Sequence, residues 1–168
     1  NRVKRLLESV KLKEVQNIID HARVARLGVV NVEGNPEVMP IVFARAGKFL
    51  VSPIDGKPKS SPRLRRLDAI QKNPHVGLVI DYFSEDWDAL WWIKISAQAR
   101  IAREDDPDFL AFERALQNKY PQYKTIPLFL DEPTAIVFSV ADTKWWASGG
   151  ITGLKRWLDS MGEINGCA

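Results

Sequence analysis

The feature that most constrains the fold is a long segment, residues 90–103, in which apolar and polar residues alternate. Successive side chains of a strand point to opposite sides, so Trp91 and Ile93 begin one face while Trp92 and Lys94 begin the other. The apolar face predicts a strand packed on a core. The second face places a tryptophan beside basic residues, which is unusual for open solvent and indicates an interface or a ligand groove.

Other segments have the composition and the bounding turn residues of strands. These predicted strands are 26–32, 36–44, 49–53, 76–83 and 134–147. Apolar residues at helical spacing predict helices over 11–25, from Ser61 to about Asn73, over 105–119, and over about 153–161. Short turns join the first three strands, so we expect an antiparallel meander, with Pro36 and Pro40 marking an edge or a bulge and Pro40 interrupting the hydrogen bonding.

These elements predict one domain over residues 1–168, with its core in about 12–147. The expected fold is a six-stranded antiparallel β-barrel with peripheral helices, in the mainly-β or α+β class. A chain of 168 residues is long enough to bury a core of its own.

The charge of the chain is small and unevenly placed. Its formal net charge is +3, which is too weak to predict nucleic-acid binding. The single cysteine excludes an internal disulfide and fits a reducing compartment, so we expect a cytoplasmic protein. No apolar run approaches bilayer length, and no signal peptide is expected at the start.

The connection between the strand 49–53 and the following helix concentrates positive charge. Lys57 and Lys59 flank Pro58, and Arg63 follows the predicted helix start at Ser61-Pro62. A helix N-terminus attracts anions through its unpaired N–H groups and its dipole. The pattern therefore predicts a phosphate site, although a solvated basic helix start is an equally good interpretation of this stretch alone.

Acid–base and nucleophilic chemistry is poorly represented. The two histidines, His21 and His75, and the one cysteine have no metal-ligand spacing, and no hydrolase or nucleotide-loop motif is present. We predict no metal site and no catalytic side chain. Such a chain suits a protein whose bound cofactor carries the reaction.

Two adjacent tryptophan pairs lie on predicted strands. Trp91-Trp92 and Trp145-Trp146 must each send one ring to either face. One ring of each pair can fill the core, and the other requires a cofactor, a partner subunit or a solvent-facing position. Core packing with a dimer contact and direct stacking on a ligand both remain open.

An ordered set of short motifs resembles a known family over about residues 12–147. The set is Gly34–Phe43, Asp55–Lys59, Leu64-Arg65-Arg66-Leu67 with Asn73-Pro74, Asp81-Tyr82, Asp86-Trp87 and Leu90-Trp91-Trp92. In this order the chain resembles the pyridoxamine 5'-phosphate oxidase-like oxidoreductases, which have a split β-barrel and bind flavin or deazaflavin. It is most similar to their F420-dependent subgroup.

The resemblance implies a homodimer with cofactor sites between subunits and a hydride transfer between the cofactor ring and a small molecule. FMN is the expected cofactor, with F420 as the alternative. The implied cofactor-binding residues are Pro40, Ile41 and Val42 along the ring, Val51, Ser52, Pro53, Lys57, Pro58, Lys59 and Arg63 around the phosphate, and Trp91 or Trp92 from the other subunit. A non-enzymatic protein that binds or senses flavin or haem is the second hypothesis, and no nucleic-acid or membrane partner is expected.

Overall fold

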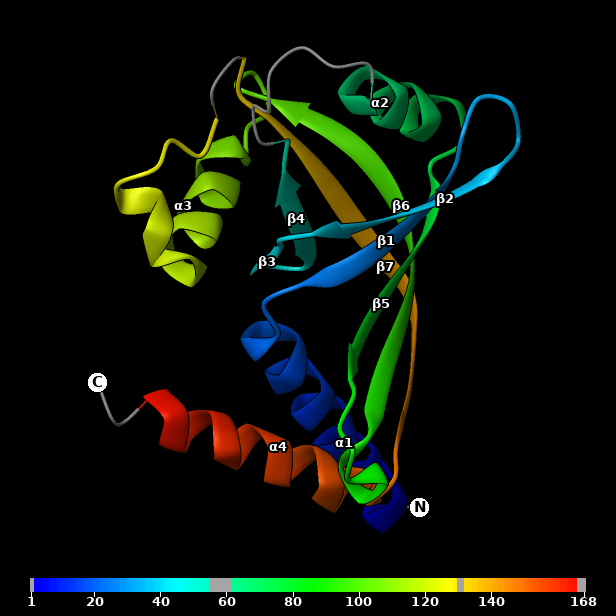
Figure 1. Cartoon of the computed structure of the whole chain (residues 1–168), viewed down its shortest axis with the longest axis vertical. Helices are drawn as coiled ribbons and strands as arrows, with labels where there is room; N and C mark the ends of the chain where they lie inside the picture. Colours follow the sequence, from blue (N-terminus) through cyan, green and yellow to red (C-terminus); the bar gives the residue numbers. More distant parts are fainter. Residues whose placement is uncertain (1, 55–61, 130–131, 166–168) are drawn as a thin grey trace. The chain divides into compact units, whose positions relative to one another are not determined.

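The structure is a computed structural model that describes residues 2–54, 62–129 and 132–165, with side chains described over 11–54, 65–129 and 132–161 (Figure 1). In chain order the elements are α1 (Arg2–His21), β1 (Ala25–Val30), β2 (Pro36–Ile41), β3 (Ala44–Ala46), β4 (Phe49–Pro53), α2 (Pro62–Lys72), β5 (His75–Tyr82), the 3-10 helix η1 (Trp87–Ala89), β6 (Trp91–Arg103), α3 (Phe109–Lys119), the 3-10 helix η2 (Pro121–Lys124), β7 (Thr134–Ala147) and α4 (Gly150–Asn165).

The strands of the described chain form one sheet in the order β2-β1-β5-β6-β7-β4-β3. The pairs β1–β2, β3–β4 and β4–β7 are antiparallel. The predicted class, an antiparallel sheet with peripheral helices, is confirmed. The described sheet has seven strands rather than the predicted six, because one predicted strand is divided.

The divided strand is the one predicted over 36–44. Its first part, β2, pairs with β1 as far as Ile41, and its second part, β3, pairs with β4 at the other end of the sheet order. The predicted three-stranded meander is therefore wrong. Pro40 lies opposite Arg26 within the β1–β2 register, so the register continues through it although it has no N–H to donate, and the chain leaves the sheet at Val42 and Phe43.

A tyrosine hydroxyl binds the backbone where the strand divides. The Tyr120 hydroxyl accepts a hydrogen bond from the Phe43 N–H at 3.1 Å, and its oxygen lies 2.8 Å from the carbonyl oxygens of both Phe43 and Arg23. It has one hydrogen and can donate to one of these carbonyls at a time. Burial raises the pKa of Tyr120, against the opposing effects of the Phe43 hydrogen bond and the Arg23 charge. A side chain thus replaces the missing sheet partner of a buried peptide group.

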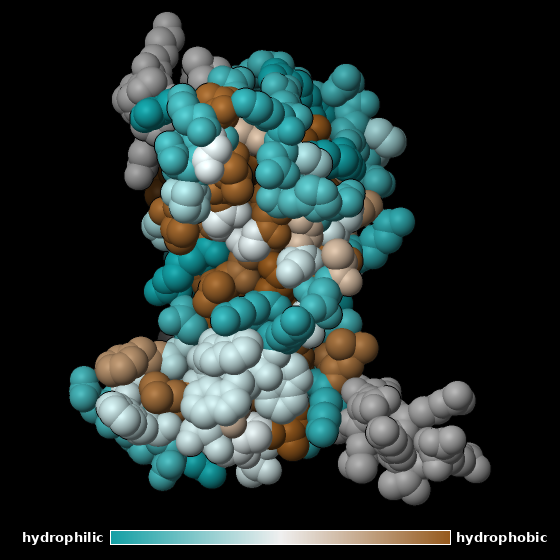
Figure 2. All heavy atoms as spheres, turned by 90° about the vertical axis from the view of Figure 1, so that its right-hand side faces the viewer, coloured by the Kyte–Doolittle hydropathy of each residue, from teal (hydrophilic) through white to brown (hydrophobic). Residues whose placement is uncertain are grey.

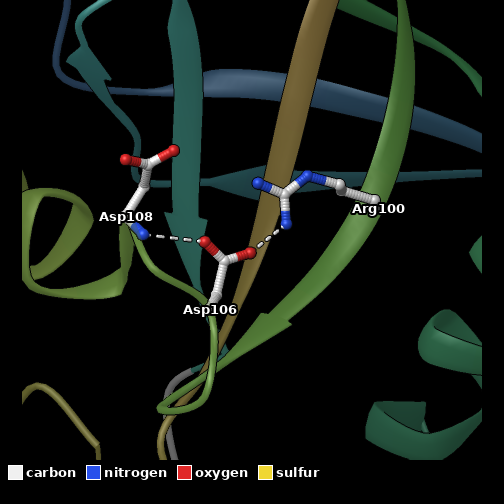
Figure 3. A network of polar contacts seen from close by, with 3 residues as sticks. All are labelled: Arg100, Asp106 and Asp108. Carbon is white, nitrogen blue, oxygen red and sulfur yellow. Dashed lines mark hydrogen bonds and ion pairs between the residues drawn. The ribbon is translucent and has the colours of Figure 1, made fainter.

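α3 begins later than the helix predicted over 105–119. The helix begins at Phe109, and the N-cap position is Asp108. The Asp106 carboxylate instead accepts a hydrogen bond from the Asp108 N–H at 3.0 Å and pairs with Arg100 of β6 (Figure 3). Burial opposes ionisation of Asp106, but these two partners outweigh it and hold its pKa below the usual value. This local turn competes with helix formation at Asp106.

The chain groups into two compact units. Unit 1 comprises residues up to 22, 79–94 and those from 144 onward, and unit 2 comprises 23–78 and 95–143. In unit 2, α3 packs on β3 and β4, with Phe109, Phe112 and Leu116 of the helix in one buried cluster with Ala44 and Val51 of the strands. Burial of this apolar face stabilises α3 in its position.

Unit 1 has its own apolar packing. Of the apolar residues at helical spacing in the helix predicted over 11–25, Val15, Ile18 and Ile19 of α1 and Ala22 just after it are buried, whereas Leu12 is 57% exposed and does not belong to the core. The helix ends at His21 rather than at the predicted residue 25. α4 lies beside α1, where Lys155 Nζ is 3.5 Å from Glu14 Oε1 (Figure 1).

Candidate functional site

The residues predicted to lie along the cofactor ring belong to β2 and the link after it, in unit 2. Pro40 is exposed on β2, which lies at one end of the sheet order. Ile41 is buried, and Val42 is half-buried against the α3 cluster. Of these three residues, Pro40 is the one whose side chain is exposed, so it could contact a ligand at the β2 edge of the sheet.

The strand predicted to lie near the phosphate, β4, is enclosed by its own chain. Val51 and Ser52 are 0% and 1% exposed, and Pro53 is also buried. The β3 register ends at the Ala44–Val51 pair, whereas β7 continues along β4 to Pro53. Ser52 and Pro53 therefore have a strand partner on the β7 side, and their opposite edge lies beyond the β3 pairing. A ligand here would meet backbone rather than these side chains.

The predicted phosphate-binding residues Lys57, Pro58 and Lys59 lie outside the described residues, as does the side chain of Arg63. The flanking elements are described. β4 ends at Pro53, and α2 begins at Pro62, the predicted first helical position. The two lysines therefore belong to the connection that leads directly into a helix N-terminus, which is the arrangement that attracts anions.

The tryptophans predicted to touch the cofactor belong to unit 1, where they line a pocket of about 350 Å³. Three neighbouring strands, β5, β6 and β7, supply most of its wall. Figure 2 shows residues of intermediate hydropathy, as tryptophan and tyrosine are, gathered in the lower part of one face. The lining residues are Val79, Asp81, Tyr82, Phe83, Leu90, Trp91, Trp92, Lys94 and Trp146.

The two tryptophans of the first pair differ in environment, as the alternation in β6 predicts. Trp91 is 2% exposed, and its ring stacks on Tyr82 at 6.3 Å between centroids and meets Trp157 of α4 edge-on at 4.9 Å. Trp92 is half-buried, and Lys94 Nζ lies 4.6 Å from its ring centroid. Trp146, of the second pair, is 46% exposed.

One polar atom in this wall has no partner among the described residues. Trp91 Nε1 is buried and has no hydrogen-bond acceptor. An unsatisfied buried donor costs about 1–3 kcal/mol, and such groups in folded proteins mark a bound water, a ligand or a functional site.

Sequence reasoning missed most of this pocket. The sequence predicts an interface or a ligand groove on the face of 90–103 that carries Trp92 and Lys94. It does not predict that Tyr82, Phe83 and Trp146 line the same pocket. The alternating pattern of each strand shows which side chains share a face of that strand. It does not show that β5, β6 and β7 are neighbours, which is what brings these aromatic residues together.

The described residues contain no group of three or more His, Cys, Asp or Glu side chains that could hold a metal ion. Both histidines are exposed, and His21 Nδ1 lies 2.8 Å from the Asn17 carbonyl oxygen. No helix in the described chain is both long enough and apolar enough to span a membrane.

The fold is that of the pyridoxamine 5'-phosphate oxidase-like split-barrel proteins. No family model matches the chain, and no curated protein matches it. Solved structures do match, and their low sequence identity means that they show the shared fold alone.

Three similar structures illustrate the range. A heme binding protein from Mycobacterium smegmatis matches with a TM-score of 0.64 and 17% identity, over 83% of this chain and 54% of that one, so this chain spans about half of its length. A protein of the pyridoxinephosphate oxidase family from Clostridium acetobutylicum, related to general stress protein 26, has a TM-score of 0.55 and 12% identity over 84% and 91% of the two chains. HutZ, the heme storage protein from Vibrio cholerae, has a TM-score of 0.56 and 12% identity over 80% and 92%.

Proposed function

We propose that the chain is an FMN-dependent oxidoreductase of the split-barrel class, with F420 as the alternative cofactor. The observation that carries the proposal is the fold, which it shares with a structure of the pyridoxinephosphate oxidase family. The scarcity of acid–base groups supports it, because the cofactor would carry the chemistry.

In this proposal the chain supplies binding and orientation. Lys57 and Lys59, with Arg63, would hold the phosphate at the start of α2, and the exposed edge of β2 at Pro40 would lie along the ring. The position of α2, beginning at Pro62 directly after the lysine segment, fits an anionic group there. When bound, the ring supplies hydride transfer at its N5 position to or from a small-molecule substrate.

We test the proposal by titrating the purified protein with FMN, F420 and riboflavin, followed by absorbance and fluorescence. The charge reversal Lys57→Glu with Lys59→Glu should weaken FMN binding at least tenfold, because charge-assisted hydrogen bonds contribute about 1.5–3 kcal/mol each. Riboflavin has no phosphate, so its binding should change little.

The matched control is Lys11→Glu with Lys13→Glu, an exposed pair in α1 with the same spacing and the same charge change. It should leave FMN binding unchanged. A protein that binds neither FMN nor F420 contradicts the proposal, and equal effects of the two double variants would place the phosphate elsewhere.

A second candidate function is non-enzymatic haem binding. It is favoured by two similar structures, the heme binding protein from Mycobacterium smegmatis and HutZ. His21 and His75 are the two histidines of the sequence, and both are exposed. A Soret band that forms when hemin is titrated into the wild type, and is lost in His21→Ala or His75→Ala, would favour this function. A hemin spectrum that the wild-type protein leaves unchanged would reject it.

We also propose that the protein is a homodimer. Support comes from β7, in which Ser139, Val140, Ala141 and Asp142 are all exposed, although this strand lies between β6 and β4 in the sheet order. The pairing of β4 with β7 ends at Ser139, so the following residues of β7 have no β4 neighbour. A second copy would cover this segment.

A further inference from the structure

We propose that the aromatic pocket of unit 1 binds a small planar aromatic carboxylate. Its lining residues include none of those predicted to bind the cofactor phosphate. The proposal therefore gives Trp91 and Trp92 a ligand of their own, in place of the contact with a partner's cofactor that the family resemblance implies.

The size and the walls of the pocket determine the shape of the ligand. Its volume of about 350 Å³ lies at the lower end of the range for small-molecule sites, about 300–1,000 Å³, which suits a ligand of one or two rings. Five of its nine lining residues are aromatic, and such walls favour a flat ring that can stack or meet an edge.

The charge of the pocket determines the sign of the ligand. Lys94 lies against the Trp92 ring and, within the part of the chain that the structure describes, has no carboxylate partner. The other charged lining residue, Asp81, already has an interaction partner in the chain. The ammonium group of Lys94 is therefore available to a ligand anion that lies beside the rings.

The ammonium group of Lys94 also favours a carboxylate as the anionic group. A carboxylate has two acceptor oxygens and no donor, which suits the N–H donors of an ammonium group. A cationic or purely apolar ligand would leave Lys94 without an anionic partner. Trp91, the one lining residue that is fully buried, lies on the opposite face of β6 from Lys94 and supplies apolar wall.

The probe is 2-naphthoate, and its neutral partner is 2-naphthamide, which has the same rings without the charge. Both are titrated into cofactor-free protein by calorimetry, with saturation-transfer NMR to identify the bound rings. We expect naphthoate to bind more tightly than naphthamide. Lys94→Met should weaken naphthoate at least tenfold and naphthamide little, whereas Trp92→Leu should weaken both.

The matched control is Lys48→Met, because Lys48 Nζ also lies over an aromatic ring, that of Phe49 at 5.2 Å, but not in this pocket. It should leave both affinities unchanged. Absence of naphthoate binding, or equal effects of Lys94→Met and Lys48→Met, would overturn the proposal.

The last measurement asks whether FMN and naphthoate compete for the protein. If the protein binds FMN, we expect naphthoate to bind at the same time with unchanged affinity. Competitive displacement of naphthoate by FMN would overturn the proposal, because the pocket would then belong to the cofactor. A protein that binds naphthoate but neither FMN nor F420 would reject the proposed function and leave this inference standing.

Discussion

At the scale of the residue, the Tyr120 hydroxyl is the group on which the divided strand depends. It contacts the Phe43 N–H and lies 2.8 Å from two carbonyl oxygens. We expect Tyr120→Phe to lower the free energy of unfolding by about 2 kcal/mol, because a buried N–H and carbonyl lose their partner. Urea unfolding measures this, and Tyr82→Phe, at a tyrosine that is 40% exposed, should cost less than about 0.5 kcal/mol.

The same hydroxyl gives this prediction a pH dependence. Burial raises the pKa of Tyr120 in the folded protein above its ordinary value of about 10. Its contribution to stability is therefore present below pH 10 and is lost as the pH rises through the folded pKa. The difference in unfolding free energy between the wild type and Tyr120→Phe should shrink above pH 10. A constant difference would show that the hydroxyl ionises equally in both states.

At the scale of the element, periodicity predicted where helices and strands exist better than which strands pair. The alternation of 90–103 appears in β6 as buried Trp91, Ile93 and Ile95 with exposed Lys94 and Ser96. The prediction of one continuous strand over 36–44 was wrong. At the point of division the Phe43 N–H binds the hydroxyl of Tyr120, a residue far away in the sequence. Propensity and spacing are local, and a partner of this kind is not.

α4 provides a test at this scale, because its Trp157 packs on two residues of unit 1. The Trp157 ring lies 4.9 Å from Trp91 and 6.2 Å from Tyr82, between centroids. Trp157→Ala should lower the unfolding free energy by about 2 kcal/mol, less than for a fully buried tryptophan because Trp157 is half-buried. Trp87→Ala is the control, since Trp87 is 71% exposed in the same unit. Equal costs for the two variants would show that Trp157 contributes no packing.

At the scale of the whole molecule, the class of fold was predictable and the site only in parts. Strand segments, helix segments and short turns were sufficient to indicate an antiparallel sheet with peripheral helices. The phosphate prediction rests on Lys57 and Lys59, which lie outside the described residues and stay a prediction. The aromatic pocket needed the order of β5, β6 and β7, which a single sequence does not encode in any local pattern.

The proposed dimer is a property of the whole molecule, and a substitution at Val140 tests it. Val140 is 42% exposed in the segment of β7 that has no β4 neighbour, and Val24 is 44% exposed in the connection before β1. In sedimentation velocity we expect the wild type to be a dimer and Val140→Glu to dissociate at concentrations where Val24→Glu stays dimeric. A buried, unpaired carboxylate at an apolar contact opposes association, whereas one in solvent does not. A monomeric wild type would reject the homodimer, and dimeric Val140→Glu would place the contact on another surface.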